Sequence, residues 1–369
     1  MILPNLVCST CGAVHEAAAL AWRCRCGGVL DVEAPTPVLA VTDRQRARTS
    51  LWRYESVLPV PLDERISLGE GSSPLVRSAA RPNVRLKLDF LMPTLSFKDR
   101  GAVVLATLAA RLGVRAALTD SSGNAGTAAA AYLARAGIPC RIVVPASTSP
   151  AKLAQMRAHG AEVVTVPGSR ADAAAHARDL VAQEPATFYA SHVHHPYFLH
   201  GVKTFGYEIW EQSGRTLPAT VLVPVGNGTL ALGCYLAFRE LVEAGLADRM
   251  PTLVAVQASG CAPVAEAFAA RRTEVAPAID PRATLAEGIA IAAPPRGAQI
   301  LAAIRDTGGT VVTVGDDDVR AARAQLAAEG LYVEPTSAVC WAAWSAVPER
   351  LRDGDVVIPL CGAGLKALG

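Results

Sequence analysis

Lys98 is the residue of this chain whose type and context best suit covalent chemistry. The sequence has 35 basic residues, and only five of them are lysines, at positions 87, 98, 152, 203 and 366. Lysine can lose its proton and attack a carbonyl carbon, which arginine does not do. Because Lys98 follows an apolar strand-like segment and opens a helix, we expect an amine held for a Schiff base. A lone lysine at a helix start is more often solvated or ion-paired, so this hypothesis depends on the loops that accompany it.

Residues 120–126 read Asp-Ser-Ser-Gly-Asn-Ala-Gly and lie between a strand-like segment and an Ala-rich helix. Ser and Asn are preferred N-cap residues, so a simple helix cap is one explanation. The other is a carboxylate receptor, in which Ser121, Ser122 and the backbone at Gly123 donate to an anion at the helix start. Asn124 adds an amide that can donate a hydrogen bond to a phenolate oxygen.

A second loop, 224–229, reads Pro-Val-Gly-Asn-Gly-Thr and also joins a strand to a helix. Glycine lets a backbone approach a phosphate closely, and the helix dipole favours the anion. The loop lacks the Gly-Lys-Ser/Thr ending of a nucleotide P-loop and the full dinucleotide fingerprint, which favours a single phosphate group. The candidate phosphate ligands are Gly226, Asn227, Gly228 and Thr229.

The last loop, 360–366, reads Leu-Cys-Gly-Ala-Gly-Leu-Lys after the final strand candidate. Cys361 offers a small hydrogen-bonding side chain at a strand end, as the mouth of a cofactor slot requires, although a C-terminal turn with a buried thiol is the plainer explanation for it alone. The four loops together supply an amine for an aldehyde, an amide for a phenolate oxygen, a cradle for one phosphate and a neutral partner for a ring nitrogen. This set matches pyridoxal 5'-phosphate.

Four cysteines cluster near the N-terminus in a Cys-x2-Cys-x12-Cys-x-Cys pattern: Cys8, Cys11, Cys24 and Cys26. Glycines beside them give the sharp turns that metal-binding knuckles need, so we prefer a four-thiolate zinc ribbon. A lobe without metal and a redox-sensitive pair are the alternatives. Four protein ligands would leave zinc no open position, which argues against catalysis there. The cysteines at 140, 234, 261 and 340 are expected to be ordinary buried residues.

The composition is that of a globular protein, with 51% hydrophobic and 18% charged residues. A net charge of +2 argues against a nucleic-acid partner. Arg111 and Arg135 interrupt the longest apolar stretches well short of a membrane span, and no signal peptide is evident. We therefore expect a cytoplasmic protein whose nine cysteines are thiols or metal ligands.

The elements that must position these loops alternate between short Val/Ile-rich runs and longer amphipathic ones, which indicates an α/β fold with parallel sheets. A linker with Pro35 and Pro37 and an Arg-rich helical stretch near 43–52 precede them. Strands are predicted at 84–88, 116–119, 141–144, 162–166, 220–223, 253–257, 310–314 and 356–360. Helices are predicted at 99–112, 124–136, 151–159, 229–243, 316–328 and 337–347. The carboxyl ends of such strands are where ligands gather.

These motifs resemble those of the tryptophan synthase β-like (fold type II) family of pyridoxal-phosphate enzymes, and its threonine synthases most of all. The resemblance rests on the lysine segment 89–102, the asparagine loop 122–124 and the phosphate loop 226–228. Shorter similar segments lie at 152–155, 201–204, 333–335 and 364–366. The cysteine lobe is similar to the N-terminal extension of many shorter threonine synthases, so the resemblance covers nearly the whole chain.

The resemblance implies two doubly wound α/β domains with mainly parallel sheets, preceded by a zinc-ribbon-like lobe at 1–35. The core at 36–369 would contain a smaller, mobile subdomain at roughly 100–200 and a larger one built from the flanking segments. It also implies a homodimer acting on a small amino acid. The implied cofactor contacts are Lys98, Phe97, Asn124, Gly226, Asn227, Gly228, Thr229 and Cys361. The implied substrate contacts are Ser121, Ser122, Gly123, Asn124 and Lys152, of which Lys152 would hold an anionic leaving group unless it is a helix-surface lysine.

Three positions depart from the family pattern. Threonine synthases usually have Asn-Pro-x-Arg where residues 195–198 read His-Pro-Tyr-Phe, so Phe198 stands in place of a cation expected near the substrate phosphate. Gly228 is followed by Thr229 and Leu230, where a further Gly and Asn are common. Cys361 replaces a usual Thr, and a thiol, like a hydroxyl, leaves a pyridine nitrogen largely unprotonated.

Three hypotheses follow. The leading one is a threonine synthase-like lyase that converts O-phosphohomoserine to threonine and phosphate, with Lys98 first binding the cofactor and then acting as the base at Cα. The second is another enzyme of the same fold, a serine/threonine ammonia-lyase or a biosynthetic β-replacement enzyme such as a phosphoserine-using synthase, which Phe198 favours. The third is a non-catalytic zinc-ribbon α/β binding protein.

Overall fold

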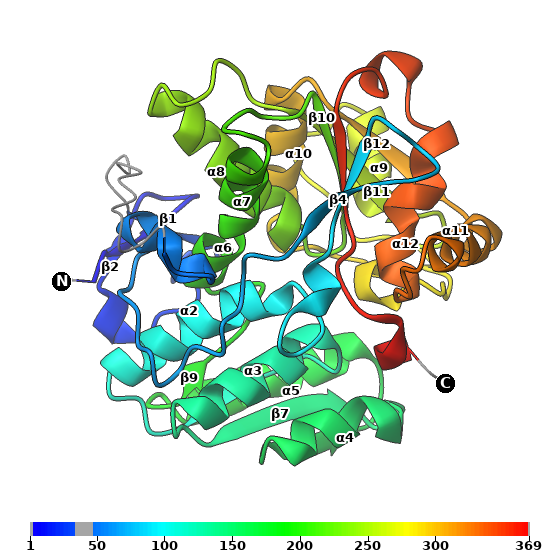
Figure 1. Cartoon of the computed structure of the whole chain (residues 1–369). Coiled ribbons are helices and arrows are strands. Elements are labelled where there is room, and N and C mark those ends of the chain that lie inside the picture. The colour runs from blue at the N-terminus through cyan, green and yellow to red at the C-terminus, as the bar shows by residue number, and fades with distance from the viewer. Residues whose placement is uncertain (1–2, 34–46, 368–369) are drawn as a thin grey trace. The chain divides into compact units, whose positions relative to one another are not determined.

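The computed structural model of the chain describes residues 3–33 and 47–367, which form two compact units. Unit 1 combines the chain up to Gly71 with Met92–Gly201. Unit 2 combines Ser72–Leu91 with the chain from Val202 onward. Figure 1 shows the course of the chain through its helices and strands. Within the described ranges, none of the helices is both long and apolar enough to span a membrane.

The N-terminal lobe belongs to unit 1 and contains a small antiparallel sheet of order β2-β1-β3. Its strands are β1 (Leu6–Cys8), β2 (Val14–His15) and β3 (Leu30–Val32). The predicted linker with Pro35 and Pro37 lies outside the described residues, together with the first part of the predicted Arg-rich helix near 43–52. The remainder of that prediction leads into a 3-10 helix at Leu51–Val57.

The main sheet of unit 1 is entirely parallel and has the order β8-β7-β6-β9. Its strands are β6 (Ala117–Thr119), β7 (Cys140–Pro145), β8 (Glu162–Val166) and β9 (Phe188–Tyr189). Its helices are α2 (Lys98–Arg111), α3 (Asn124–Arg135), α4 (Pro150–Ala158), α5 (Arg170–Gln183) and α6 (Pro196–Val202). Both α3 and α5 contact β7, whose side chains are nearly all buried, as expected for a parallel strand covered on both faces.

The sheet of unit 2 has the order β12-β11-β10-β13-β5-β4 and is parallel except for the edge strand β4. Its strands are β4 (Leu75–Arg77), β5 (Val84–Lys87), β10 (Thr220–Pro224), β11 (Thr252–Ala258), β12 (Thr310–Val314) and β13 (Val356–Pro359). Its helices are α7 (Thr204–Gln212), α8 (Thr229–Glu243), α9 (Pro263–Ala269), α10 (Gly297–Asp306), α11 (Asp316–Ala328) and α12 (Pro335–Ala342). The central strand β10 is buried throughout, because α8 and α12 both pack against it.

The predicted α/β class with mainly parallel sheets and a small N-terminal lobe is confirmed. Each of the eight predicted strands forms with its ends within one residue of the prediction. Five of the six predicted helices agree equally well, and the sixth is α12, which begins earlier and passes into a 3-10 turn at Ala343–Ser345. The strands and α-helices of the described residues that were not predicted from the sequence are β1, β2, β3, β4, β9, α5, α6, α7, α9 and α10.

Two of the five lysines are buried in ion pairs of unit 2. The Nζ of Lys87 lies 2.6 Å from a carboxylate oxygen of Glu208 and also donates to the carbonyl of Ser73. The Nζ of Lys203 donates to both carboxylate oxygens of Glu240, at 2.9 and 3.0 Å. These two lysines therefore have structural roles in unit 2.

Candidate active site

Lys98 is the first residue of α2 and is half-buried in unit 1. The carboxylate of Asp99 closes the turn before it by accepting hydrogen bonds from the backbone N–H of Thr94, at 2.7 Å, and from the Thr94 hydroxyl. Within this turn Leu95 has a φ of 63°, a left-handed conformation that is strained for a branched side chain. The ring of Phe97 lies beside the amine, with Nζ 4.1 Å from the ring centre. The lysine is thus held by a turn that local sequence preference alone would not favour.

Buried carboxylates and the hydrogen-bond donors around them support the turn that precedes Lys98. Tyr132 of α3 donates to Glu70 at 3.1 Å and is also hydrogen-bonded to Asp99. Glu70 further accepts from the indole N–H of Trp52 at 2.7 Å. Burial, and after it the charges of Asp99 and Glu70, raise the pKa of Tyr132, so its hydroxyl keeps its proton and acts as a donor. The group ties the segment before Gly71 to the helix that carries Lys98.

The asparagine loop follows β6 in unit 1 and leads directly into α3. Ser121 is buried, and Ser122, Gly123 and Asn124 are partly exposed. The N-cap of α3 is Gly123, which has no side chain to accept from the first N–H groups of the helix, and the first intrahelical bond is made by Thr127. A β-carbon at position 126 would lie 1.9 Å from the carbonyl oxygen of Ser121, so only glycine allows this tight loop. The loop has the form expected of an anion receptor.

Lys152 lies on α4, which follows β7, and is partly buried. Since β7 pairs in parallel with β6, the loops after both strands lie at the same edge of one sheet. Lys152 and the asparagine loop therefore share the carboxyl edge of the unit 1 sheet, and their contact with substrate stays a prediction.

The segment after β9 belongs to the same edge and was missed as a site element. β9 pairs in parallel with β6, and Ala190 donates to the carbonyl of Leu118 at 2.8 Å. Two residues farther on, His192 is 5% exposed, and its Nδ1 has no hydrogen-bond partner among the described residues. The available signal was the run of four histidines between positions 192 and 200.

His192 predicts a measurable loss of stability in acid. Burial, and after it the positive charge of Lys98, hold the pKa of His192 well below its ordinary value of 6.5. Below pH 6.5 the unfolded chain binds a proton that the folded chain does not, so stability present above that pH is lost as the pH falls. The slope from this one group is at most about 1.4 kcal/mol per pH unit. We expect His192→Gln to flatten the slope in chemical denaturation between pH 5 and 7 (roughly the ordinary His range), whereas the exposed control His176→Gln should leave it unchanged. Equal slopes in the two variants would contradict the assignment.

Phe198, which replaces the expected cation, is a packing residue of unit 1. Its side chain is 1% exposed. Its ring lies flat against Gly101 of α2, where an added β-carbon would be 2.5 Å from three ring carbons. The ring of His192 is 5.8 Å away. A charged arginine in this environment would require a buried anion, so Phe198 accounts for the departure from the family pattern by filling the interior.

The phosphate loop follows β10 in unit 2 and is shaped by two glycines that cannot be replaced without movement. A β-carbon at Gly226 would lie 2.8 Å from the Cα of Ile289, and one at Gly228 would lie 2.3 Å from a side-chain carbon of Ile300. Gly228 has a φ of 73° and is the N-cap of α8, so it offers no side-chain acceptor to the helix. The N–H groups that precede the first intrahelical bond, made by Leu232 to Gly228, have no partner from the helix itself. This arrangement fits one phosphate group.

Gln257 at the end of β11 holds this loop and was also missed. Its amide N–H donates to the carbonyl of Val225 at 3.0 Å, and its side-chain oxygen accepts from the N–H groups of Val264 and Ala265. The side chain is fully buried. A lone Gln in a strand carries no recognisable signal, so only the fold reveals this role.

Gly228 gives a prediction about cofactor affinity. In Gly228→Ala, a left-handed alanine is strained by about 1–2 kcal/mol and its β-carbon collides with Ile300, so the loop must shift. We expect the affinity for pyridoxal 5'-phosphate, followed by absorbance titration, to fall by roughly tenfold or more. Gly245, at the other end of the same helix, is the matched control, because its φ is 67° and no atom lies near an added β-carbon. Gly245→Ala should lose some stability and no affinity, and equal affinities in the two variants would exclude the loop as the phosphate site.

Cys361 follows β13 and is 2% exposed. The loop is fixed to α12, because the N–H of Gly362 donates to the hydroxyl of Ser337 at 2.7 Å and the N–H of Glu334 donates to the carbonyl of Gly362 at 3.0 Å. β13 pairs in parallel with β10. Cys361 and the phosphate loop therefore lie at the same edge of the unit 2 sheet.

The predicted site residues thus form two groups, one in each unit. Unit 1 contains the amine of Lys98 with Phe97, the asparagine loop and Lys152. Unit 2 contains the phosphate loop and Cys361. The donors fit pyridoxal 5'-phosphate: a glycine cradle that β-carbons would fill, uncapped helix N-termini for anions, and a lysine in a strained turn.

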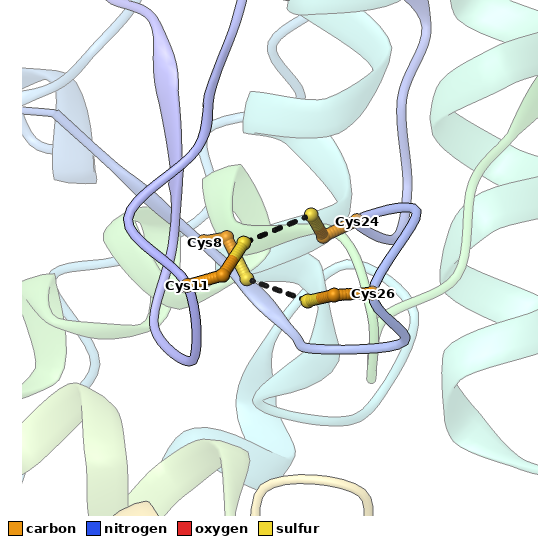
Figure 2. A group of neighbouring side chains, drawn as sticks. All are labelled: Cys8, Cys11, Cys24 and Cys26. Atoms are coloured by element: carbon orange, nitrogen blue, oxygen red, sulfur yellow. Dashed lines mark hydrogen bonds between the residues drawn. The ribbon is translucent and has the colours of Figure 1, made fainter.

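The four cysteines of the lobe converge as a metal site would require (Figure 2). Their sulfur atoms all lie within 4.8 Å of one another, with Cys8 and Cys26 3.5 Å apart and Cys11 and Cys24 3.6 Å apart. Tetrahedral zinc with bonds of about 2.3 Å places its sulfur ligands roughly 3.8 Å apart. Backbone hydrogen bonding, chiefly at Cys11, lowers the pKa of Cys8 to about 6, whereas hydrogen bonds with the other three cysteine side chains raise the pKa of Cys26 to about 12.

The chain is similar to known enzymes over most of its length. The family model of the pyridoxal-phosphate dependent enzymes matches residues 66–362. The chain is 36% identical to the threonine synthase of Methanosarcina acetivorans over 346 residues, covering 90% of this chain and 84% of that protein. It is 33% identical to the threonine synthase of Methanocaldococcus jannaschii, covering 97% and 92%.

Solved structures show the same fold. A threonine deaminase from T.th. superimposes with a TM-score of 0.66 and 26% identity, covering 79% of this chain and 92% of that one. A maize serine racemase superimposes with a TM-score of 0.68 at 20% identity, covering 79% and 88%, a likeness of fold alone.

Proposed function

This chain belongs to the pyridoxal-phosphate dependent enzymes and is a threonine synthase-like lyase, and on that premise we propose that its substrate is O-phosphohomoserine, which it converts with one water molecule to threonine and phosphate. The observation that carries the proposal is the similarity to threonine synthases along nearly the whole chain, including the cysteine lobe. It is supported by Lys98, whose amine opens a helix from a strained turn in unit 1.

Pyridoxal 5'-phosphate would be held by the residues that the sequence indicates. The phosphate would lie on Gly226, Asn227, Gly228 and Thr229, with Cys361 as the neutral partner of the ring nitrogen and Asn124 and Phe97 as further contacts. When bound, this cofactor supplies an electron sink that stabilises negative charge at the substrate α-carbon. The thiol of Cys361 cannot protonate the ring nitrogen as a carboxylic acid could.

The residues of the chain then have defined roles. Lys98 would bind the cofactor and, once released, take the proton from the α-carbon as a general base and return it later. Ser121, Ser122 and the backbone at Gly123 would hold the substrate carboxylate. Lys152 would stabilise the departing phosphate by its charge.

A second candidate is an ammonia-lyase acting on threonine or serine, or a β-replacement enzyme such as a phosphoserine-using synthase. The observation that favours it is the buried Phe198, since no cation stands at that position to bind a substrate phosphate. The likeness to the threonine deaminase structure supports the same candidate.

The two candidates are separated by products. Purified holoenzyme is incubated with O-phosphohomoserine, and phosphate and threonine are measured. In parallel it is incubated with threonine and with serine, and keto acid is measured. Equimolar phosphate and threonine without keto acid supports the proposal. Keto acid from threonine or serine, with no phosphate released, supports the ammonia-lyase. Inactivity in both assays would point to a β-replacement reaction.

We also propose a structural zinc ion on Cys8, Cys11, Cys24 and Cys26, and a cytoplasmic homodimer, as the family resemblance implies. The converging sulfur atoms support the metal. Metal analysis should find one zinc per chain, reduced to a small fraction in Cys11→Ser.

Light scattering at micromolar concentration should give twice the chain mass of 38.4 kDa, and a mass of one chain would exclude the dimer.

A further inference from the structure

Trp22 connects the cysteine lobe to the parallel sheet of unit 1. It lies two residues before Cys24, so a metal held there restrains the backbone that carries the indole. Its ring meets Tyr189 edge-on, with ring centres 5.1 Å apart and planes at 83°. It also meets His194 at 5.0 Å and 65°. Trp22 packs against the core group of Leu118, a neighbour of Tyr189 in the sheet.

The contact continues from Tyr189 to the asparagine loop. The hydroxyl of Tyr189 donates to the carboxylate of Asp120 at 3.0 Å, and both residues are buried. Burial, and after it the charge of Asp120, raise the pKa of Tyr189, so the hydroxyl remains protonated and the bond persists at neutral pH. Asp120 immediately precedes Ser121, the first member of the predicted carboxylate receptor. Backbone links and side-chain contacts therefore connect Cys24, a proposed metal ligand, to that receptor through Trp22, Tyr189 and Asp120.

A second contact fixes the lobe at the same place. The hydroxyl of Tyr197, at the start of α6, donates to the backbone carbonyl of Pro4 at 3.0 Å. The lobe thus contacts this part of unit 1 at two points, through Trp22 and through Pro4. The segment between β9 and α6 contains His192, which lies at the same sheet edge as the asparagine loop.

We propose that Trp22 is a positioning residue for the substrate-carboxylate loop, so that the metal-filled lobe sets the geometry of residues 121–124 through Tyr189 and Asp120. The proposal gives the cysteine lobe a role in substrate binding in addition to folding. It rests on the proposed function only in naming the ligand as an amino-acid carboxylate. The coupling of lobe to loop stands on contacts within unit 1.

The first test needs no activity. Hydrogen exchange of the backbone amides at 119–126 is measured in the wild-type holoenzyme, in Trp22→Ala and in Trp22→Phe. Trp22→Ala should raise the exchange rate of these amides by about fivefold or more, because the loop loses its support. Trp22→Phe keeps an edge-on aromatic contact and should restore most of the protection. Trp344→Ala is the matched control, since Trp344 is a partly buried tryptophan of unit 2 and its loss should leave 119–126 unchanged.

The second test uses kinetics with the amino-acid substrate. Trp22→Ala and Tyr189→Phe should each raise KM by about tenfold while kcat changes less than about threefold, as expected when ground-state and transition-state binding are lost together. The double variant should show no more than the larger single effect, because both changes break the same line of contacts. Independent, multiplying effects would overturn the proposal.

Metal removal provides the third test. Chelation of the wild-type protein should reproduce the faster exchange at 119–126, and chelation of Trp22→Ala should add nothing. If Trp22→Ala and metal removal both leave that exchange unchanged, the lobe does not position the loop and the proposal fails, whatever the substrate. If exchange responds and no amino acid turns over, the coupling stands and the proposed function fails instead.

Discussion

Replacing Lys98 with alanine is expected to lower kcat by about a thousandfold or more, because the variant loses both the covalent anchor of the cofactor and the base at the α-carbon. Turnover of O-phosphohomoserine gives the rate, and the visible absorbance band of lysine-bound cofactor should disappear together with it. The fold should be unaffected, since Lys98 is only half-buried and the turn before it is closed by Asp99 and Thr94.

Lys98→Arg is the matched control for charge. Arginine preserves the positive charge near His192 but cannot lose its proton or form the covalent link at neutral pH. It should therefore be as inactive as the alanine variant. An arginine variant with wild-type turnover would show that Lys98 contributes only charge. An alanine variant that retains turnover within tenfold (roughly the effect of one ordinary contact) would show that Lys98 is not needed for the chemistry.

Replacing Lys203 with methionine is expected to produce the opposite effect, a large loss of stability with unchanged chemistry. Lys203 and Glu240 are both buried in unit 2, and Tyr207 donates to the same carboxylate. Burial lowers the pKa of Lys203 and raises that of Glu240, while the contact between the two charges opposes both shifts. Removing one partner leaves the other charge buried alone, which costs about 3–5 kcal/mol of unfolding free energy.

The measurement is chemical denaturation of Lys203→Met, with kcat determined at a temperature where the variant remains folded. The control is the triple variant Lys203→Met, Glu240→Leu, Tyr207→Phe, which removes the buried charge of Glu240 and the hydroxyl that donates to it, and should recover most of the loss. A single variant within about 1 kcal/mol of wild type would mean that the pair behaves as an exposed one.

Lys98 and Lys203 together show what can and what cannot be predicted from a single sequence. The chain has only five lysines, and one of them, Lys98, opens a helix after a strained turn. The scarcity of lysine alone could not distinguish Lys98 from Lys87 and Lys203. The partner of Lys87, Glu208, is distant in the sequence, and the partner of Lys203, Glu240, lies on another helix. Burial in a pair depends on packing, which no local pattern encodes.

The elements that the sequence predicted were those with a strong local signal. Val-rich strands and helices ended by glycine, such as α3, formed where expected. β9 was missed because it has only two residues and pairs through its neighbour β6, and the histidine run after it was not connected with that edge. The start of α5 was missed although Ser169 and Asp172 form a capping box that the sequence displays.

The loops were predictable because glycine is informative where backbones crowd. Gly226 and Gly228 were predicted to contact a phosphate, and that contact stays a prediction. The structure shows that Ile289 and Ile300 leave no room for a β-carbon at these two positions. Gln257 and Tyr189, which hold the two loops in place, have no sequence signal because their roles depend on strand neighbours. The substrate could not be predicted from the sequence in the same way, because the role of Phe198 depends on the residues that pack around it.

The most direct test is to find which side chain carries the cofactor. Holoenzyme is reduced with borohydride, digested, and sequenced by mass spectrometry. We expect a phosphopyridoxyl group on the ε-nitrogen of Lys98 and on no other residue. A label on Lys152, Lys366 or another lysine, or reduced holoenzyme in which Lys98 is unmodified, would contradict the assignment of Lys98 as the cofactor-binding residue.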